Sequence, residues 1–241
     1  MSDLVLKLAF DNADFFVGAV LDMAIDLIPV FLFQMVFGMY IYRHFCVTGI
    51  YFFIRCDNRK SWFLKETFKL LGFSHLYQTA ILIFSMIILI FISDFKIDMC
   101  GIVLVLYYVI IYSMWLFVTC LIINCIALKL GSVFAYVSVI GVQILFLGMF
   151  NIYEKYVSMD GSQLLINDIW LKLNPLSGLV FKWHSSLFEN VNNKINIFHI
   201  IYDFNETVAI LCVLAIFFVV LGMELVKRQD IIDENREIGG I

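Results

Sequence analysis

Long runs of apolar residues that contain no Asp, Glu, Lys or Arg dominate this chain of 241 residues. Each run predicts a membrane-spanning α-helix, because a bilayer core about 30 Å thick needs about 20 helical residues. None alternates apolar and polar residues over about 10 positions, as transmembrane β-strands do. The expected fold is therefore all-α, a polytopic helical membrane protein. The five predicted spans are Leu27–Tyr42, Leu70–Ser93, Met99–Leu128, Leu130–Tyr153 and Thr207–Met223.

The first 26 residues have a different pattern, in which polar residues recur at every third or fourth position among apolar ones. This spacing places the polar residues in one stripe along a helix. Residues 1–26 are thus expected to form an amphipathic helix, either lying in the membrane interface or crossing it as a sixth span. Crossing would cost roughly 2.5–3.5 kcal/mol for each Asp at the bilayer centre. The stripe consists of Asp3, Lys7, Asp11, Asp14, Gly18, Asp22 and Asp26.

Composition supports a membrane protein, since 63% of the residues are hydrophobic and 15% are charged. Soluble chains are usually about 45–50% apolar and about 25% charged. The sequence has no basic domain and no nucleic-acid-binding motif, so a nucleic-acid partner is not expected. The bilayer itself is the expected surrounding, and the plasma membrane the expected location.

The basic residues predict which side of the membrane each loop faces. If the five runs alternate in direction, ten of the 16 Lys and Arg residues lie on one side, between Arg43 and Lys69, at Lys129 and in the tail 227–241. The positive-inside rule places this side in the cytoplasm. The transmembrane domain then covers residues 27–226, with the C-terminus cytoplasmic and the N-terminus outside.

Polar groups within the spans are few, and none forms a recognised catalytic motif. Histidines and cysteines are scattered, without an HExxH motif or metal-ligand spacing, and no GxxxxGK[ST] loop that could bind ATP occurs. We therefore expect no enzyme activity, metal or cofactor in this chain, and any ATP-Mg would be bound by a partner. Gln34, Asn124 and Gln143 either form interhelical hydrogen bonds, worth about 0.6–2 kcal/mol each, or line a translocation path.

The predicted cytoplasmic segment 43–69 contains a short amphipathic helix, which Asp57 or Asn58 could cap. We expect this helix to lie parallel to the membrane, either as a basic anchor for anionic headgroups or as a docking element for a cytoplasmic protein. Its aromatic residues Trp62 and Phe63 share one side with Glu66, and Lys65 and Lys69 lie near the other.

Residues 55–65 read Arg-Cys-Asp-Asn-Arg-Lys-Ser-Trp-Phe-Leu-Lys after a span rich in Tyr and Phe. This segment resembles the R-x-x-x-R-K-x-W-[FY] segment of small Gram-positive ABC-2-type exporter permeases. That family includes the membrane subunits of peptide, bacteriocin and lantibiotic-immunity exporters. Asn174-Pro175-Leu176-Ser177 is also similar to a turn in the family's extracellular segment. The family has six spans, so the five runs here correspond to its second to sixth spans, and its first is missing or replaced by the striped N-terminus.

The resemblance implies a membrane-spanning permease that exports an amphipathic or hydrophobic substrate such as an antimicrobial peptide. It implies a cytoplasmic ABC ATPase in two copies and a second permease subunit, identical or related. It also makes residues 43–69 a coupling segment and residues 154–206 an extracellular segment. The residues expected to contact the ATPase are Arg55, Asp57, Arg59, Trp62, Phe63, Lys65 and Glu66.

Two further classes of function are alternatives to a permease. A non-transporting membrane sensor or assembly scaffold could use the same loop to dock a soluble protein. An intramembrane enzyme would need clustered His, Asp or Glu within the spans, and only isolated polar residues occur there. In the outer segment, the apolar residues after Ser162 predict a short helix that stops before Pro175. That segment is either a pair of interfacial helices or a lid over an exit path.

Overall fold

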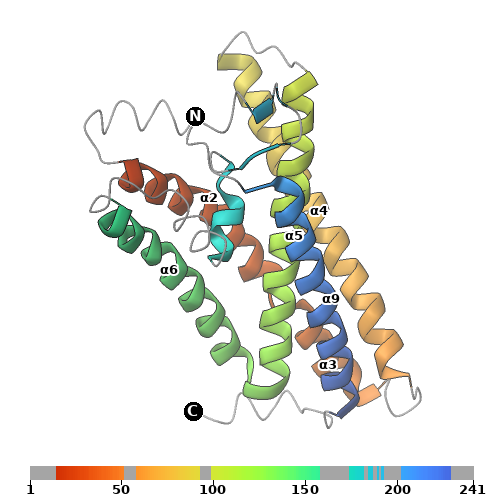
Figure 1. The fold of residues 1–241 in the computed structure, drawn as a ribbon. Helices are drawn as coiled ribbons and strands as arrows, with labels where there is room; N and C mark the ends of the chain where they lie inside the picture. Colours follow the sequence, from red (N-terminus) through yellow and green to blue (C-terminus); the bar gives the residue numbers. More distant parts are fainter. Residues whose placement is uncertain are drawn as a thin grey trace. The chain divides into compact units, whose positions relative to one another are not determined.

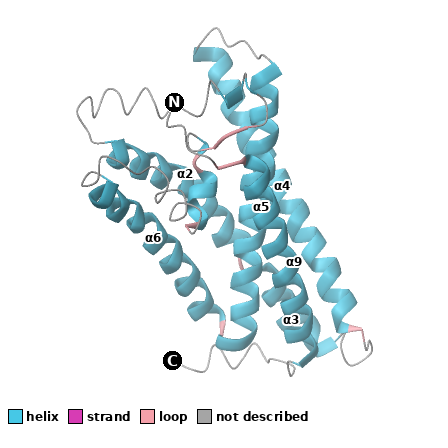
Figure 2. Cartoon of the chain, viewed as in Figure 1, coloured by secondary structure: helices cyan, strands magenta, loops and turns pink. Residues whose placement is uncertain are grey.

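The computed structural model describes residues 15–51, 58–92, 99–157, 174–181, 184–186, 189, 191–192 and 202–228. Within these ranges the regular secondary structure is helical, and an isolated bridge joins Ser185 and Asp203 (Figure 2). The long helices, labelled in Figure 1, are α2 (Phe15–Phe37), α3 (Tyr40–Tyr51), α4 (Arg59–Ile92), α5 (Met99–Leu130), α6 (Ser132–Val157) and α9 (Phe204–Arg228).

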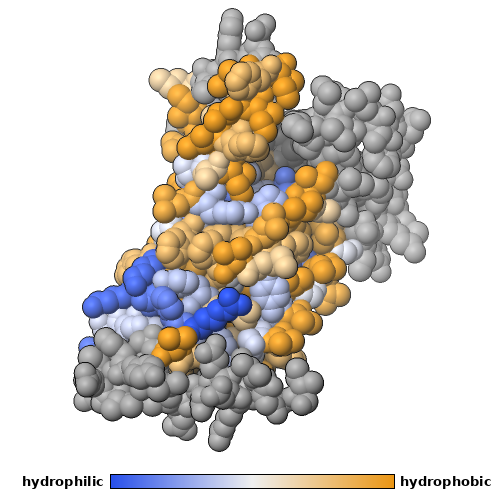
Figure 3. Space-filling view, turned by 180° about the vertical axis from the view of Figure 1, so that it is seen from behind, coloured by the Kyte–Doolittle hydropathy of each residue, from blue (hydrophilic) through white to orange (hydrophobic). Residues whose placement is uncertain are grey.

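Among the described residues, five helical stretches are long and apolar enough to cross a membrane, which confirms the predicted all-helical fold and agrees with the five predicted spans. The first stretch, Met23–Val47, combines most of α2 with the first part of α3. The other four contain or closely match the predicted runs. Among the residues that are coloured in Figure 3, apolar ones predominate, and hydrophilic ones gather in the lower half of the view.

The N-terminal part of α2 differs from the expected boundary at residue 26. Helix α2 begins at Phe15 and continues without interruption to Phe37, so residues 15–26 share one helix with the first span. Asp26, the last residue of the predicted polar stripe, is exposed. Residues 1–14 of the predicted amphipathic helix lie outside the described ranges.

Helix α4 also differs from the sequence expectation, because residues 59–69 do not form a separate helix parallel to the membrane. They are the first turns of a single helix of 34 residues that continues through the second span. Asn58 caps it as predicted, since its Oδ1 accepts a hydrogen bond from the Ser61 N–H at 3.2 Å. No proline interrupts α4. At 1.5 Å per residue its length is about 50 Å, more than the hydrocarbon core of a bilayer, about 30 Å thick.

The described residues fall into two compact units. The second unit consists of Leu32–Val139 and Asn205–Ile241. Within it, α4 packs along α5, and α3 contacts both helices. The buried residues of α5 extend from Ile111 to Leu128, so this helix forms the core of the unit. Only Gly131, with a φ of 87°, separates the end of α5 from the start of α6.

The first unit consists of Met1–Phe31 and Ile140–Phe204. Its described part contains the 3₁₀ helix η1 (Pro175–Leu179), which Asn174 caps by accepting a hydrogen bond from the Leu176 N–H at 3.0 Å. Asn174 also donates from Nδ2 to the carbonyl oxygen of Phe146 in α6 at 2.9 Å. The predicted Asn-Pro turn is thus confirmed, whereas the predicted helix after Ser162 lies outside the described residues.

Candidate functional site

The first turns of α4 are fastened to α9 within the second unit. Phe63 is fully buried, and its ring lies so close to Gly222 of α9 that a Cβ built at Gly222 would be 2.2 Å from the ring atom Cζ. One turn before Phe63, Lys60 forms an ion pair with Glu224 of α9. An apolar contact and a charged contact therefore hold the beginning of α4 against the end of α9.

A second set of contacts fastens the same part of α4 to α3. Trp62 of α4 lies beside Phe45 of α3, with ring centroids 6.1 Å apart. The next turn carries Glu66, whose side chain is 6% exposed and whose Oε2 is 3.1 Å from Nδ1 of His44 in α3. Tyr40, at the start of α3, forms a further side-chain hydrogen bond with Glu66.

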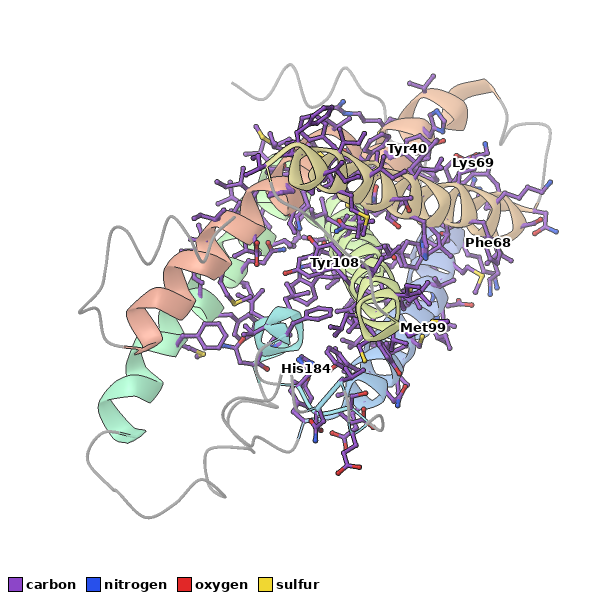
Figure 4. All side chains as sticks on the ribbon, turned by 90° about the horizontal axis from the view of Figure 1, so that it is seen from above. Tyr40, Phe68, Lys69, Met99, Tyr108 and His184 are labelled. Carbon is purple, nitrogen blue, oxygen red and sulfur yellow. The ribbon has the colours of Figure 1, made fainter. Side chains whose placement is uncertain are left out.

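We call Tyr40, His44, Glu66 and Lys69 the Glu66 cluster. Lys69 donates from Nζ to Oε1 of Glu66 at 2.7 Å, so the buried carboxylate binds one partner on its own helix and two on α3. The Tyr40 and His44 rings contact each other, with centroids 4.7 Å apart. Figure 4 shows Tyr40 and Lys69 toward the same side of α4.

The side chains of the Glu66 cluster are suited to holding α3 and α4 together. A buried carboxylate needs donors or cations to offset the loss of hydration, and this one receives them from α3 and α4. His44 and Lys69 are about half exposed, at 48% and 54%, so their outer sides face away from the interior. Among the described residues, no three His, Cys, Asp or Glu side chains lie close enough together to hold a metal ion.

The predicted ATPase-contacting residues do not form one exposed patch. Arg59 begins α4 and is half-buried, and Lys65 is exposed, whereas Phe63 and Glu66 are buried within the chain. Phe63 therefore packs against α9 where it was expected to anchor a partner. The reason is that α4 continues as one helix, so positions 63, 66 and 70 share the face that packs against its neighbours. Arg55 and Asp57 lie outside the described residues.

Two exposed apolar residues beside Lys65 were not singled out from the sequence. Leu64 and Phe68 are 37% and 63% exposed. They lie four residues apart and thus occupy one face of α4, and Lys65, three residues before Phe68, borders that face. Figure 4 shows Phe68 on the other side of α4 from Tyr40. The helical period of the segment could have revealed this face once α4 was known to be continuous.

The polar residues within the spans divide between the two units. In the second unit, Gln34 donates from Nε2 to Oγ1 of Thr119 in α5 at 2.9 Å, and Asn124 of α5 hydrogen-bonds the backbone of the first span. Gln34 and Asn124 thus form interhelical hydrogen bonds, which was one of the two roles expected for them; the other was lining a translocation path. Gln143 belongs to the first unit and is buried, and its amide atoms make no hydrogen bond within the part of the chain described.

Replacing Glu66 tests whether the cluster holds α3 to α4. Glu66→Ala removes the shared acceptor and should lower the free energy of unfolding by roughly 2–3 kcal/mol, since hydrogen bonds to charged groups are worth about 1.5–3 kcal/mol. Glu66→Gln keeps an acceptor oxygen and should lower the free energy of unfolding by less than half of that amount. Thermal unfolding in detergent would measure both, with exposed Lys65→Ala as the control. Equal melting temperatures for Glu66→Ala and Lys65→Ala would contradict this role.

Comparisons with known proteins do not assign this chain to a family. No family model, curated protein or solved structure matches the chain.

Proposed function

We propose that this chain is a membrane-spanning permease subunit of an ATP-driven exporter. Together with a second permease subunit it would form a path for an amphipathic or hydrophobic substrate such as a peptide, and a separate cytoplasmic ATPase would supply the energy. The observation that carries this proposal is the continuous helix α4. Near its beginning one side of the helix is exposed and partly basic, and the buried face of its span, here called the inner face, carries polar groups.

The length of α4 supports a mechanical role. Its 34 residues exceed what a bilayer core requires, so one end extends beyond the hydrocarbon region. The end that begins at Arg59 belongs to the segment that the positive-inside rule places in the cytoplasm. Because a single helix connects this end to the span, a displacement imposed on the end is carried along the helix axis. A separate membrane-parallel helix would transmit such a displacement less directly.

The inner face of α4 supports a polar path through the second unit. Beyond the Glu66 cluster this face carries Ser74 and Gln78, which are both buried. His75 lies beside them, and its Nε2 is 3.2 Å from Oγ of buried Ser113 in α5. Polar residues within a membrane bundle are costly to bury and commonly mark a substrate or ion pathway.

The contacts of the first turns also support coupling. Lys60 and Phe63 hold this part of α4 to α9, and Glu66 holds it to α3. A partner that binds the exposed side would therefore act on three helices at once. That exposed side presents Leu64, Lys65 and Phe68, an apolar and basic combination suited to docking a protein. The sequence resemblance of residues 55–65 to exporter permeases supports the same assignment.

Co-purification from native membranes tests the proposal. We expect the wild-type chain to bring down an ATP-hydrolysing subunit, and the double variant Lys65→Glu/Phe68→Ala to retain at most a tenth of it. The matched control is Phe84→Ala, which removes an equally exposed aromatic ring, 65% exposed, further along the same helix. This control should retain the full amount of ATPase, because position 84 lies within the predicted span.

The outcomes separate the competing functions. If the wild-type chain co-purifies with a soluble protein that does not hydrolyse ATP, the chain is a sensor or scaffold and the exporter proposal fails. If the ATPase is present and the double variant binds it as well as Phe84→Ala does, the exposed side of α4 is not the contact. Substrate-stimulated ATP hydrolysis by the reconstituted complex would then support transport by another coupling surface.

A further inference from the structure

The first span is interrupted at Gly38 and Met39. Helix α2 ends at Phe37 and α3 begins at Tyr40. Regular helical hydrogen bonds are nevertheless present on both sides of the gap, from the Gly38 N–H to the Gln34 carbonyl at 2.7 Å and from the Arg43 N–H to the Met39 carbonyl at 2.9 Å. The interruption is therefore local, and the helical ladder resumes directly after it.

The side chain of Asn124 is inserted at this interruption from α5. Its Nδ2 donates to the Gly38 carbonyl at 2.8 Å, and its Oδ1 accepts from the Tyr42 N–H at 2.8 Å. These two backbone groups are four residues apart, and a continuous α-helix would join them directly. The carboxamide of Asn124 thus replaces one backbone hydrogen bond by two. Insertion of a side chain into the ladder is a recognised cause of helix kinks.

Asn124 is well placed to remain inserted. It is fully buried, and Nδ2 also donates to the Cys120 carbonyl in the preceding turn of α5 at 2.7 Å. This bond ties the carboxamide to its own helix while it bridges the neighbouring one. The nearby pair of Gln34 and Thr119, 2.9 Å apart, adds a second hydrogen bond between α2 and α5.

The interrupted form has no room for a side chain at position 38. A Cβ built at this position would be 2.2 Å from the Gln34 carbonyl oxygen and 3.3 Å from Cδ1 of Ile123 in α5. A carbonyl oxygen of the backbone cannot move aside as the end of a flexible side chain can. In a regular helix any residue other than proline is accepted at an interior position, and alanine is favoured over glycine by about 1 kcal/mol.

We infer that Gly38 and Met39 form a two-state joint in the first span, controlled by the carboxamide of Asn124. In the inserted state Asn124 bridges the Gly38 carbonyl and the Tyr42 N–H. In the closed state Asn124 withdraws, the two backbone groups bond directly, and α2 and α3 become one helix. Both states satisfy these backbone groups, as a bilayer requires. The joint is a property of the chain itself and does not depend on the proposed exporter function.

The joint is adjacent to the Glu66 cluster. Tyr40, the first residue of α3, and His44, one turn later, both bind Glu66 of α4. A change in the direction of α3 at the joint therefore acts on the beginning of α4. Between the two states, the hydrogen bonds from Asn124 to the Gly38 carbonyl and the Tyr42 N–H are exchanged for a direct backbone bond. The exchange involves no proton transfer and no covalent step.

Carbonyl NMR of a single labelled peptide bond tests the joint in the full chain in lipid nanodiscs. Met39–Tyr40 is the sole Met-Tyr pair in the sequence, so ¹³C-carbonyl Met and ¹⁵N Tyr labelling gives one assigned signal. We expect a major wild-type signal from the inserted state and a minor one at a shift closer to helical values. Asn124→Leu removes the inserting amide, and Gly38→Ala excludes the inserted geometry, so each should make the minor signal the major one.

Ser113→Ala is the matched control, because Ser113 is buried in the same helix α5 but bonds His75 and Ile110 instead of the joint. It should keep the wild-type pair of signals. The two joint variants act on different helices, so misfolding of one leaves the other as a test. The inference is overturned if neither variant moves the Met39 signal, or if the wild-type spectrum contains no signal at the position that the variants produce.

Discussion

Gly222→Ala is expected to destabilise the chain by about 1–3 kcal/mol, the range for overpacking a filled interior. The added methyl carbon would be 2.2 Å from Cζ, 2.7 Å from Cε1 and 3.1 Å from Cε2 of Phe63. Rotation of the ring about its own axis leaves Cζ in place and so cannot relieve the closest of these contacts, and Phe63 is fully buried. The helices α4 and α9 would have to separate, which should lower the melting temperature in detergent by several degrees.

A second substitution distinguishes this collision from a general effect of changing glycine. Phe63→Leu shortens the side chain that meets the new methyl group, so the double variant Phe63→Leu/Gly222→Ala should be more stable than the sum of the two single effects predicts. Gly141→Ala in α6 is the matched control, because nothing lies within 4 Å of a Cβ built there. That variant should be neutral or slightly stabilised. Equal melting temperatures for Gly222→Ala and Gly141→Ala would show that α4 and α9 do not pack closely here.

Acidification is expected to destabilise the first unit through His184. The imidazole is fully buried, stacks on Phe204 with centroids 4.5 Å apart and on Tyr202 at 4.7 Å, and has Nδ1 2.9 Å from the Val180 carbonyl. Burial lowers the pKa of His184 from 6.5 to about 4, although the Val180 carbonyl and the nearby Asp203 charge act in the opposite direction. The folded chain therefore favours the neutral ring.

The sign of the pH effect follows from this difference. Between pH 6.5 and pH 4 the unfolded chain binds a proton at His184 that the folded chain does not, so stability falls as the pH is lowered. The contribution of the neutral His184 to the free energy of unfolding is fully present above pH 6.5. By pH 4 about 3 kcal/mol of it is lost, at 1.36 kcal/mol for each pKa unit. Melting temperatures measured across this window would show the fall.

His184→Phe keeps an aromatic ring between Phe204 and Tyr202 but cannot bind the proton. Its melting temperature should therefore depend less on pH than that of the wild-type chain, and the difference between the two curves isolates His184 from the other titrating groups. Phe181→Leu serves as the control, because it changes a ring 6.0 Å from the His184 ring and leaves the imidazole in place; its pH dependence should match that of the wild-type chain. Parallel curves for His184→Phe and the wild type would exclude His184 as the source.

The spans were predictable from the sequence because uninterrupted apolar runs have few alternative structures. The predictions for residues 99–128 and 207–223 lie within the helices Met99–Leu130 and Phe204–Arg228. Local chemistry was predictable too, since Asn58 caps α4 and Asn174 begins a turn. The separate amphipathic helix was the main error, because each predicted span ended at the nearest charged residue, so residues 59–69 were separated from the span that begins at Leu70. Charged side chains do not end a helix that no proline interrupts.

The contacts of the candidate site could not be predicted in the same way. Glu66 binds His44 across 22 positions of the sequence, and Phe63 meets Gly222 in another helix. Such pairs depend on the rotation of each helix about its axis, which a single sequence does not specify when most faces are apolar. The carboxamide of Asn124 was expected to bond a neighbouring helix, but the interruption that it bridges has no sequence signal beyond one glycine.

Gly131 is the single residue between the end of α5 and the start of α6. Its φ of 87° lies in the left-handed region, which glycine adopts without the steric penalty that a Cβ brings. With one residue between them, two long apolar helices have no free chain length, so we expect both to enter a bilayer in the same insertion event. Lys129 places a charge in the last turn of α5, beside this junction. Because a charge is costly to bring into hydrocarbon, we expect the junction to stay at a membrane surface.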